Sequence, residues 1–324
     1  MASMLKSLLF LFVIAIFTTI SPSKALSRNF YANICPDVEE MVREAVEKKA
    51  KETFITIPAT LRLYFHDCFV NGCDASIMIA STKQNKAEKD HEENLSLAGD
   101  GFDTVIKAKK AVDAVSNCRY KVSCADILTM ATRDAIYLMG GPYYEVELGR
   151  YDGVTSTADS VEGNLPLPTD DVNNLTALFA KKGLDVDDII VLSGSHRVGV
   201  AHCTSISHRL YGEDSTMPID PVYASNLRKA CPKDVDRNKF VFMVPNSSNV
   251  FDNAYYRNLK ELKGVFESDQ ALYTDPRSKP FVEELATDGQ LFHRAFARSM
   301  IKLGRVGVKT VSNGNIRRRC DAFN

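Results

Sequence analysis

Residues 61–76 read LRLYFHDCFVNGCDAS, and the interpretation of the whole sequence starts from this stretch. If its first half is helical, Arg62 and His66 are four residues apart and share one helix face. A fixed cation beside a group that titrates near neutral pH suits a reaction in which a proton moves while negative charge develops. Cleavage of the O–O bond of a peroxide is such a reaction. Taken alone, however, the pair fits a surface arginine and a structural core histidine better.

The second half of the same stretch places hard oxygen ligands on a short loop. Side-chain oxygens come from Asp67, Asp74 and Ser76, and the intervening Val70 and Gly72 can offer carbonyl oxygens. Mixed carboxylate, hydroxyl and carbonyl oxygens on a constrained loop fit calcium. Because the spacing is not that of an EF-hand, these residues by themselves leave calcium as one option.

A second cluster lies in residues 192–203, which read LSGSHRVGVAHC. His196 stands between glycines, where a planar ligand can approach the backbone closely. A single histidine facing an open side is the arrangement of haem peroxidases, and its other ring N–H usually meets an acceptor, for which Asp269 is a candidate. A buried structural histidine is the alternative. The remaining histidines are interpreted as structural or surface groups: His91, His202, His208 and His293.

The N-terminus has the features of a signal peptide. Lys6 precedes a short apolar run, and small residues follow up to Ala25, so cleavage after Ala25 is favoured. The run is too short to span a bilayer comfortably, although a signal anchor is the alternative. The sequence therefore predicts residues 1–25 as a signal peptide and a secreted, extracellular protein.

Export changes how the cysteines are read. All eight follow the signal peptide, and an even number in an oxidising compartment indicates four disulfides. Sequence alone allows 105 pairings, and no pair of CxxC spacings supports a zinc site instead. The residues are Cys35, Cys68, Cys73, Cys118, Cys124, Cys203, Cys231 and Cys320.

Composition is that of a soluble globular protein. The 324 residues are 45% hydrophobic, and the net charge of −1 gives no indication of nucleic acid or an anionic membrane as a partner. The run Arg317–Arg318–Arg319 is expected to be a solvated tail. Three N-glycosylation sequons begin at Asn94, Asn174 and Asn246.

Helical periodicity dominates the pattern, which predicts one mostly helical domain with two lobes. Strand signals are few, the best being 145–148. Expected helices are 38–51, 123–139, 172–182, 187–192, 251–263 and 279–303.

The motifs together resemble those of the secreted plant haem peroxidases, often called class III. The resemblance covers the mature chain to Cys320 and includes all eight cysteines. It implies an all-α, two-lobed bundle in one domain, 26–324, with haem b between a distal lobe (about 26–165 plus the C-terminal tail) and a proximal lobe (about 166–309). The motifs, in order, are LRLYFHDCFVNGCDAS, EKD before Asn94, SCADIL, LGR-D, LSGSHRVGVAHC, FDNAYY and SDQAL.

Around the haem, the resemblance implies a role for each matching residue. Arg62 and His66 are the distal acid–base pair, Phe65 packs over the haem, and Asn94 orients His66. On the other side His196 is the iron ligand and Asp269 its hydrogen-bond partner. Aromatic donors are expected near Pro166.

Away from the haem, the resemblance implies a distal calcium site and a set of cross-links. The calcium ligands are Asp67, Val70, Gly72, Asp74 and Ser76, with Glu88 acting through water and also linking the loop to Asn94. Asp126 and Arg150 would form a buried ion pair. The implied disulfides are Cys35–Cys118, Cys68–Cys73, Cys124–Cys320 and Cys203–Cys231.

The chain departs from the family on the proximal side. The family usually has threonine after the proximal histidine and a further aspartate, both ligands of a second calcium, where this chain has Arg197 and Val244. Asp252 and Ser247 remain. Loss of two ligands and gain of a cation predict that the proximal ion is absent and that Arg197 pairs with Asp252. An Arg197 pointing to solvent over a looser loop is the alternative.

The function expected is reduction of hydrogen peroxide coupled to one-electron oxidation of small phenolic or aromatic donors. The alternatives are a cell-wall-associated binding or structural protein with weak catalysis and, less consistent with Arg62, a secreted haem carrier. We expect a monomer in the cell wall or apoplast, with no nucleic-acid or membrane partner. The physiological donor is not specified by the sequence.

Overall fold

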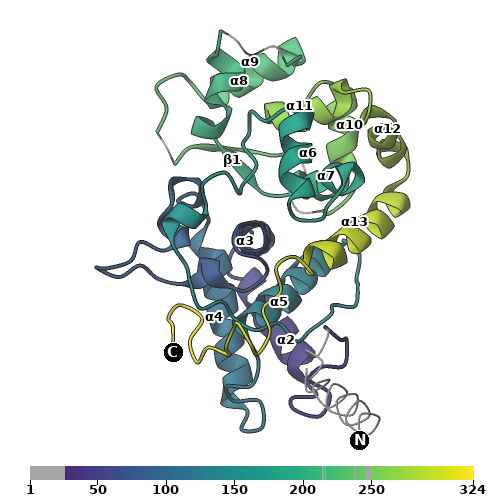
Figure 1. Cartoon of the computed structure of the whole chain (residues 1–324). Helices are drawn as coiled ribbons and strands as arrows, with labels where there is room; N and C mark the ends of the chain where they lie inside the picture. Colours follow the sequence, from purple (N-terminus) through teal and green to yellow (C-terminus); the bar gives the residue numbers. More distant parts are fainter. Residues whose placement is uncertain (1–25, 214, 216, 237, 245–249) are drawn as a thin grey trace, which may run out of the picture.

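The structure is a computed structural model that describes residues 26–324 except 214, 216, 237 and 245–249 (Figure 1). The predicted signal peptide, Asn246 and Ser247 lie outside the described residues. The mostly helical class predicted from the sequence is confirmed, because the described residues form helices joined by loops and one small sheet. The helices are α2 (Val38–Ala50), α3 (Thr56–Val70), α4 (Gly99–Ala114), α5 (Cys124–Leu138), α6 (Val172–Ala180), α7 (Val186–Ser193), α8 (Ser207–Tyr211), α9 (Pro221–Ala230), α10 (Ala254–Lys260), α11 (Glu267–Thr274), α12 (Lys279–Thr287) and α13 (Gly289–Leu303).

Helices α2 to α5 form the lower half of the molecule in Figure 1. There α3 packs against α4 and α5, and α2 packs against the same two helices. Helix α5 is buried along nearly its whole length, and Ser123 caps it by accepting a hydrogen bond from the backbone N–H of Asp126 at 3.1 Å. Helix α3 is apolar around most of its circumference and lies next to the upper half, so its side chains reach both parts of the core.

The upper half contains α6, α7 and α10–α12, with α8, α9 and the small sheet above and to one side (Figure 1). Helix α13 crosses from this half to the lower one and packs against α7. The sheet pairs β1 (Val200–His202) with β2 (Phe240–Phe242) in antiparallel register, so that Ala201 faces Val241. Strands of three residues are too short to be recognised by alternation in the sequence.

Four disulfides cross-link the described residues, of which three join segments 28–196 residues apart and one, Cys68–Cys73, closes a loop of five residues. They are the pairs that the family resemblance implies: Cys35–Cys118, Cys68–Cys73, Cys124–Cys320 and Cys203–Cys231. The Cys124–Cys320 bond closes 196 residues and holds the C-terminal tail against the start of α5. The assignment of distal and proximal lobes to fixed residue ranges remains a prediction.

Two of the predicted elements were wrong. Residues 145–148 do not form a strand, because Leu148 exchanges a single pair of backbone hydrogen bonds with Ser27 and no ladder continues from it. The expected helix 279–303 is two helices, since Asp288 has an extended backbone and caps α13 by accepting a hydrogen bond from Leu291 N–H at 2.8 Å. The other expected helices are confirmed with ends displaced by at most three residues.

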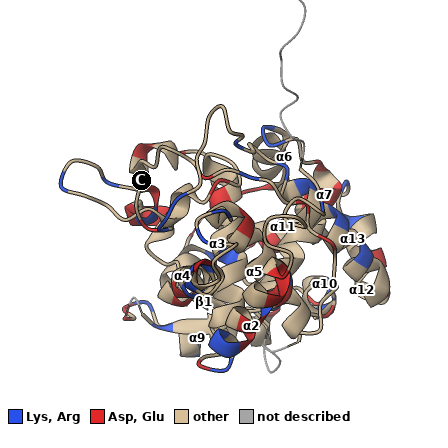
Figure 2. Ribbon diagram, turned by 90° about the horizontal axis from the view of Figure 1, so that it is seen from below, with Lys and Arg blue, Asp and Glu red and all other residues tan. Residues whose placement is uncertain are grey.

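The solvated tail predicted for 317–319 was also wrong in part. Arg317 is fully buried, its side chain lies 3.7 Å from the Asp152 carboxylate, and it donates a hydrogen bond to the Ala75 carbonyl at 2.6 Å. The neighbouring Cys320 disulfide pulls this segment inward, so a charge that looks terminal in the sequence lies in the core. Elsewhere acidic and basic residues are interspersed along the ribbon rather than gathered by sign (Figure 2), which agrees with the balanced net charge.

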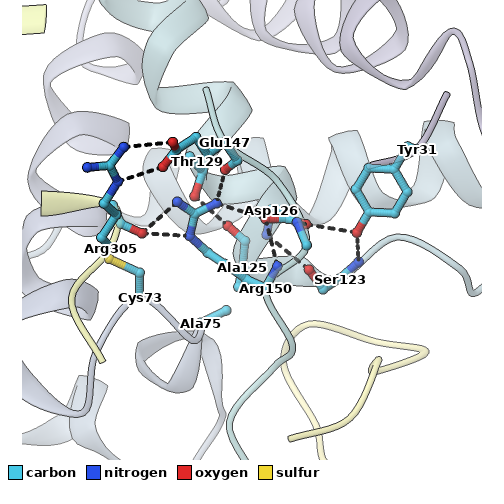
Figure 3. A network of polar contacts seen from close by, with 12 residues as sticks. Tyr31, Cys73, Ala75, Ser123, Ala125, Asp126, Thr129, Glu147, Arg150 and Arg305 are labelled. Atoms are coloured by element: carbon cyan, nitrogen blue, oxygen red, sulfur yellow. Dashed lines mark hydrogen bonds and ion pairs between the residues drawn. The ribbon is translucent and has the colours of Figure 1, made fainter. Parts of the chain in front are cut away.

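A buried ion pair fixes the centre of the lower half (Figure 3). Arg150 Nη1 lies 2.9 Å from Asp126 Oδ1, and both side chains are almost inaccessible to solvent, as the family resemblance implied. The same carboxylate accepts hydrogen bonds from the Tyr31 hydroxyl at 2.8 Å and from Gly149 N–H at 2.7 Å. Because both oxygens of Asp126 accept hydrogen bonds, this charge pair is stabilised despite its burial.

Candidate active site and metal sites

His66 lies on α3, and its ring orientation is fixed by Asn94. The ring Nδ1 lies 2.7 Å from Asn94 Oδ1, and the amide nitrogen of Asn94 donates to the Glu88 carbonyl at 2.8 Å. Because the Asn94 oxygen can only accept, Nδ1 carries the proton and Nε2 is the basic nitrogen. Burial, and next the positive charge of Arg62, lower the pKa of His66 to about 3. The imidazole is therefore a neutral base over the physiological pH range.

Arg62 precedes His66 by one helical turn and is held by a residue that sequence reasoning missed. Its guanidinium donates to the backbone carbonyl and to the hydroxyl of Ser96, both at 2.9 Å. Solvent still reaches the Arg62 side chain. The surrounding protein nevertheless removes part of the hydration of the guanidinium, which lowers the pKa of Arg62 to about 10. It remains a cation at neutral pH. No signal in the sequence pointed to Ser96 except its nearness to Asn94.

His196 lies in a tight turn between α7 and β1, and Asp269 fixes its ring. Nδ1 of His196 lies 2.7 Å from Asp269 Oδ1, while the side chain is 40% exposed. Gly194, two residues earlier, lets Tyr256 pack closely against this turn, because a Cβ there would lie 2.4 Å from the Tyr256 hydroxyl. The hydrogen bond to a carboxylate leaves Nε2 as the nitrogen that can bind a metal.

Two contacts bring the His66 helix and the His196 segment together. A Cβ on Gly199, three residues after His196, would lie 3.0 Å from the Pro58 side chain on α3. On the α6 side, the ring centroids of Phe65 and Phe179 are 6.2 Å apart. The segments that carry the two clusters, 130 residues apart in sequence, therefore lie side by side where the two halves meet.

The donor set at this junction fits haem. The imidazole of His196 has its Nδ1 hydrogen-bonded to a carboxylate and its Nε2 directed away from that partner, so Nε2 would be able to hold the iron of a haem. On α3, a neutral imidazole and a guanidinium suit the opposite face, where a small molecule would react. Phe65 is only partly buried and stacks on Phe69 at 4.0 Å, so an apolar ring is present beside them.

The loop after α3 has the carboxylates expected for calcium. Asp67 and Asp74 are almost completely buried, and each accepts backbone N–H bonds, from Ala75 at 2.9 Å and from Ser76 at 3.0 Å respectively. Burial raises the pKa of Asp67 well above its usual range, and the nearby charge of Asp74 raises it further. Burial also raises the pKa of Asp74. A divalent cation would offset this unfavourable concentration of acidic groups.

Two buried oxygens beside these carboxylates have no hydrogen-bond partner. They are Ser76 Oγ and Glu88 Oε2, and both residues are fully buried. Burial raises the pKa of Glu88 to about 8, and the Asp74 charge contributes to the increase. Unpartnered buried oxygens are costly, so their position on the predicted calcium loop fits an oxygen-ligated ion and its bound water.

Other features of the loop limit how the ion could be held. In the described part of the chain, no group of three acidic, histidine or cysteine side chains is arranged to hold a metal ion by itself. The Val70 carbonyl accepts a hydrogen bond from Lys182 Nζ at 3.3 Å, and Lys309 Nζ lies 3.5 Å from Asp74. Gly72 has φ +103° and abuts Gly307, which fixes the backbone between these ligands. Sequence reasoning did not identify either lysine.

On the proximal side, Arg197 points inward. It is fully buried, and its Nε donates to Asp252 Oδ1, which also accepts from Ala254 N–H at 2.8 Å. Burial would raise the pKa of Asp252, but hydrogen bonds led by that from Arg197 lower it overall. Val244 is also buried. The solvent-directed alternative for Arg197 is therefore wrong.

Pro166 lies in the partly buried loop before α6, where the Pro168 carbonyl accepts a hydrogen bond from Ser268 N–H at 2.9 Å. That contact ties the loop to the start of α11, which carries Asp269. His91 and His208 lie within ion-pair distance of Glu162 and Glu267 respectively, and His293 contacts the Phe251 carbonyl.

Comparison with known proteins agrees with this geometry. A family model described as peroxidase matches residues 42–288. The chain is 63% identical to Peroxidase 50 of Arabidopsis thaliana over 98% of each chain, and 62% identical to Peroxidase 51 of the same plant over the full length of both. It is 57% identical to Peroxidase 73 of Arabidopsis thaliana over 92% of each chain. Among the described residues, no helix is long and apolar enough to cross a membrane.

Proposed function

The chain belongs to the class III plant peroxidases, and from this premise we propose how its own residues carry out the peroxidase reaction. Members of this family bind haem and calcium and are generally secreted. We assign His66 as the acid–base group, Arg62 as the group that stabilises charge on the departing oxygen, and His196 as the iron ligand. The fixed tautomer of His66 is the observation that carries the proposal.

Haem, when bound, supplies the electrons that reduce the peroxide and recovers them from the donor one at a time. Nε2 of His66 accepts a proton from one peroxide oxygen and returns it to the other oxygen, which leaves as water. Arg62 stabilises the negative charge that develops on the departing oxygen. Ser96 holds the guanidinium in place for this step, and Asn94 prevents His66 from rotating.

Replacement of His66 by leucine tests the assignment. General acid–base groups contribute about 10²–10⁴-fold, so we expect the peroxide step to slow by that factor in stopped-flow absorbance of the haem band. His293→Leu is the matched control, because His293 contacts the Phe251 carbonyl and none of the proposed site residues. A rate for His66→Leu equal to that of the control would reject the distal assignment.

We infer that calcium binds at the distal loop alone. The distal loop supplies Asp67, Asp74 and the unpartnered oxygens of Ser76 and Glu88. At the proximal position the guanidinium of Arg197 already neutralises Asp252, and a second cation there would be repelled. Metal analysis of the purified protein should give one calcium ion per chain, and two would contradict this inference.

We infer small phenols as donors that approach near Pro166, and a monomer located in the cell wall. The partly buried proline loop and the aromatic ring of Phe65 support an aromatic donor. Oxidation of a phenol such as guaiacol by the haem-loaded protein and peroxide should restore the resting haem spectrum. Failure of every phenol tested to do so would exclude this donor class.

A further inference from the structure

The carboxylate that holds His196 is shared with a second side chain. Asp269 Oδ1 lies 2.7 Å from His196 Nδ1 and also accepts a hydrogen bond from the Tyr255 hydroxyl at 2.9 Å. The other oxygen, Oδ2, accepts a hydrogen bond from the backbone N–H of Phe266 at 3.0 Å. The imidazole therefore competes with a phenol for the same acceptor atom.

The Tyr255 hydroxyl stays protonated and donates its hydrogen bond to the Asp269 carboxylate. It is buried on α10, and burial, followed by the charge of Asp269, raises the pKa of Tyr255 well above its usual range. The phenol therefore keeps its proton at all physiological pH values. The ring centroids of Tyr255 and His196 are 6.3 Å apart with their planes at 76°, so the two rings meet edge-on as well as sharing Asp269.

The start of α10 is fixed on both sides, which keeps Tyr255 in place. Arg197, the neighbour of His196, pairs with Asp252 immediately before the helix. Asn253 donates hydrogen bonds to the carbonyls of Leu285 and Ala286 at 2.9 and 3.1 Å. The histidine turn and the tyrosine helix are thus tied to one another at two points, through Arg197–Asp252 and through Asp269.

We propose that Tyr255 is a positioning residue that limits how strongly Asp269 draws the Nδ1 proton of His196, and so limits electron donation from the imidazole to a bound iron. The proposal rests on the assignment of His196 as the iron ligand. A carboxylate oxygen that accepts two hydrogen bonds carries less negative charge toward each donor than one that accepts a single bond. Partners of a ligand histidine tune its basicity, and through it the metal.

Tyr256 provides a matched control within the same helix. It is also fully buried on α10, but its hydroxyl donates to the carbonyls of Ile190 and Val191 at 3.1 and 3.3 Å. Replacing either tyrosine by phenylalanine removes one buried hydroxyl and its hydrogen bonding. Only the Tyr255 substitution changes the number of hydrogen bonds that Asp269 accepts.

The test compares Tyr255→Phe and Tyr256→Phe in the haem-loaded protein. We expect Tyr255→Phe to lower the ferric–ferrous midpoint potential and to raise the iron–histidine stretching frequency in resonance Raman spectra of the ferrous state. Tyr256→Phe should leave both values at those of the unsubstituted protein. Equal shifts in the two variants, or no shift in Tyr255→Phe, would overturn the proposal.

The same experiment separates this inference from the assignment on which it rests. Absence of any iron–histidine band in the unsubstituted protein would reject His196 as the ligand, and the inference with it. A normal band that Tyr255→Phe does not move would reject the inference alone.

A second measurement does not require haem. In protein labelled with nitrogen-15 histidine, removal of the competing phenol should strengthen the hydrogen bond from His196 Nδ1 to Asp269 and move the proton resonance downfield. An unmoved resonance in Tyr255→Phe would contradict the sharing of Asp269 directly.

Discussion

Replacing Glu88 by glutamine should make the calcium-free protein more stable than the unsubstituted one, by an amount that grows with pH. Glu88 is fully buried, its Oε1 accepts from the Asn71 side chain at 2.6 Å, and its Oε2 has no partner. Burial raises its pKa from the ordinary 4.5 to about 8 when no ion is present. A neutral glutamine keeps the acceptor for Asn71 and removes the charge.

The sign of the effect follows from proton binding. Between pH 4.5 and about 8 the folded state holds a proton on Glu88 that the unfolded state has released, so the stability of the calcium-free protein falls as pH rises through this window. At about 1.4 kcal/mol for each pH unit, the full rise in pKa corresponds to about 5 kcal/mol at pH 8 and above. Below pH 4.5 Glu88 contributes no pH dependence.

The assay is urea unfolding of the two proteins at a series of pH values, after chelation and removal of calcium and with the disulfides intact. The advantage of Glu88→Gln should be small at pH 4.5 and should increase toward pH 8, with about 5 kcal/mol as its upper limit. Glu162→Gln is the control, because that side chain is 83% exposed. If the stabilities of the Glu88→Gln and unsubstituted proteins fall equally as the pH rises, Glu88 is not the group whose raised pKa causes the pH dependence.

Addition of calcium should reverse the order of stability of the Glu88→Gln and unsubstituted proteins. A bound ion favours the ionised carboxylate, so the unsubstituted protein should gain stability on calcium addition and lose most of its pH dependence in this window. Glu88→Gln should bind calcium more weakly and gain less. An equal gain in both proteins would mean that Glu88 does not contribute to the site.

Three further outcomes follow from the structure. Asp126→Ala leaves the buried guanidinium of Arg150 without its carboxylate partner and should lower the free energy of unfolding, measured in urea, by about 3–5 kcal/mol. A loss of only about 0.5 kcal/mol, which is typical of a surface substitution, would refute the role of the pair. Asn174 is exposed at the start of α6 whereas Asn94 is buried and bonded to His66, so peptide mapping of secreted protein should find a glycan on Asn174 and none on Asn94. Arg197→Thr combined with Val244→Asp should add a second calcium ion per chain by metal analysis, and an unchanged content would show that other residues prevent binding there.

Much of the site could be predicted because its chemistry is local in sequence. Arg62 and His66 share a helix face by spacing alone, and the oxygens proposed to bind calcium lie mostly within one short segment, so their proximity follows from chain geometry. Partners far along the chain, such as Asn94 for His66 and Asp269 for His196, were predicted with their roles only through the family resemblance. In the structure each histidine Nδ1 lies 2.7 Å from the side-chain oxygen of its partner.

Other features depend on contacts that no sequence pattern encodes. Ser96 holds Arg62, Lys182 and Lys309 approach the predicted calcium loop, and Tyr255 shares the acceptor of His196. Each contact joins residues that are distant in sequence and of common type, and the side-chain direction that creates it is set by packing.

The sequence by itself determined the helical class, the disulfide count and the two histidine clusters, because periodicity, export and motif spacing are properties of neighbouring residues. Only the tertiary structure decided that Arg317 is buried, that Arg197 turns inward to Asp252, and that Glu88 Oε2 is left without a partner. Charge in a sequence predicts exposure on average, but the cost of burying a charge depends on the counter-charges that the fold brings to it from elsewhere in the chain.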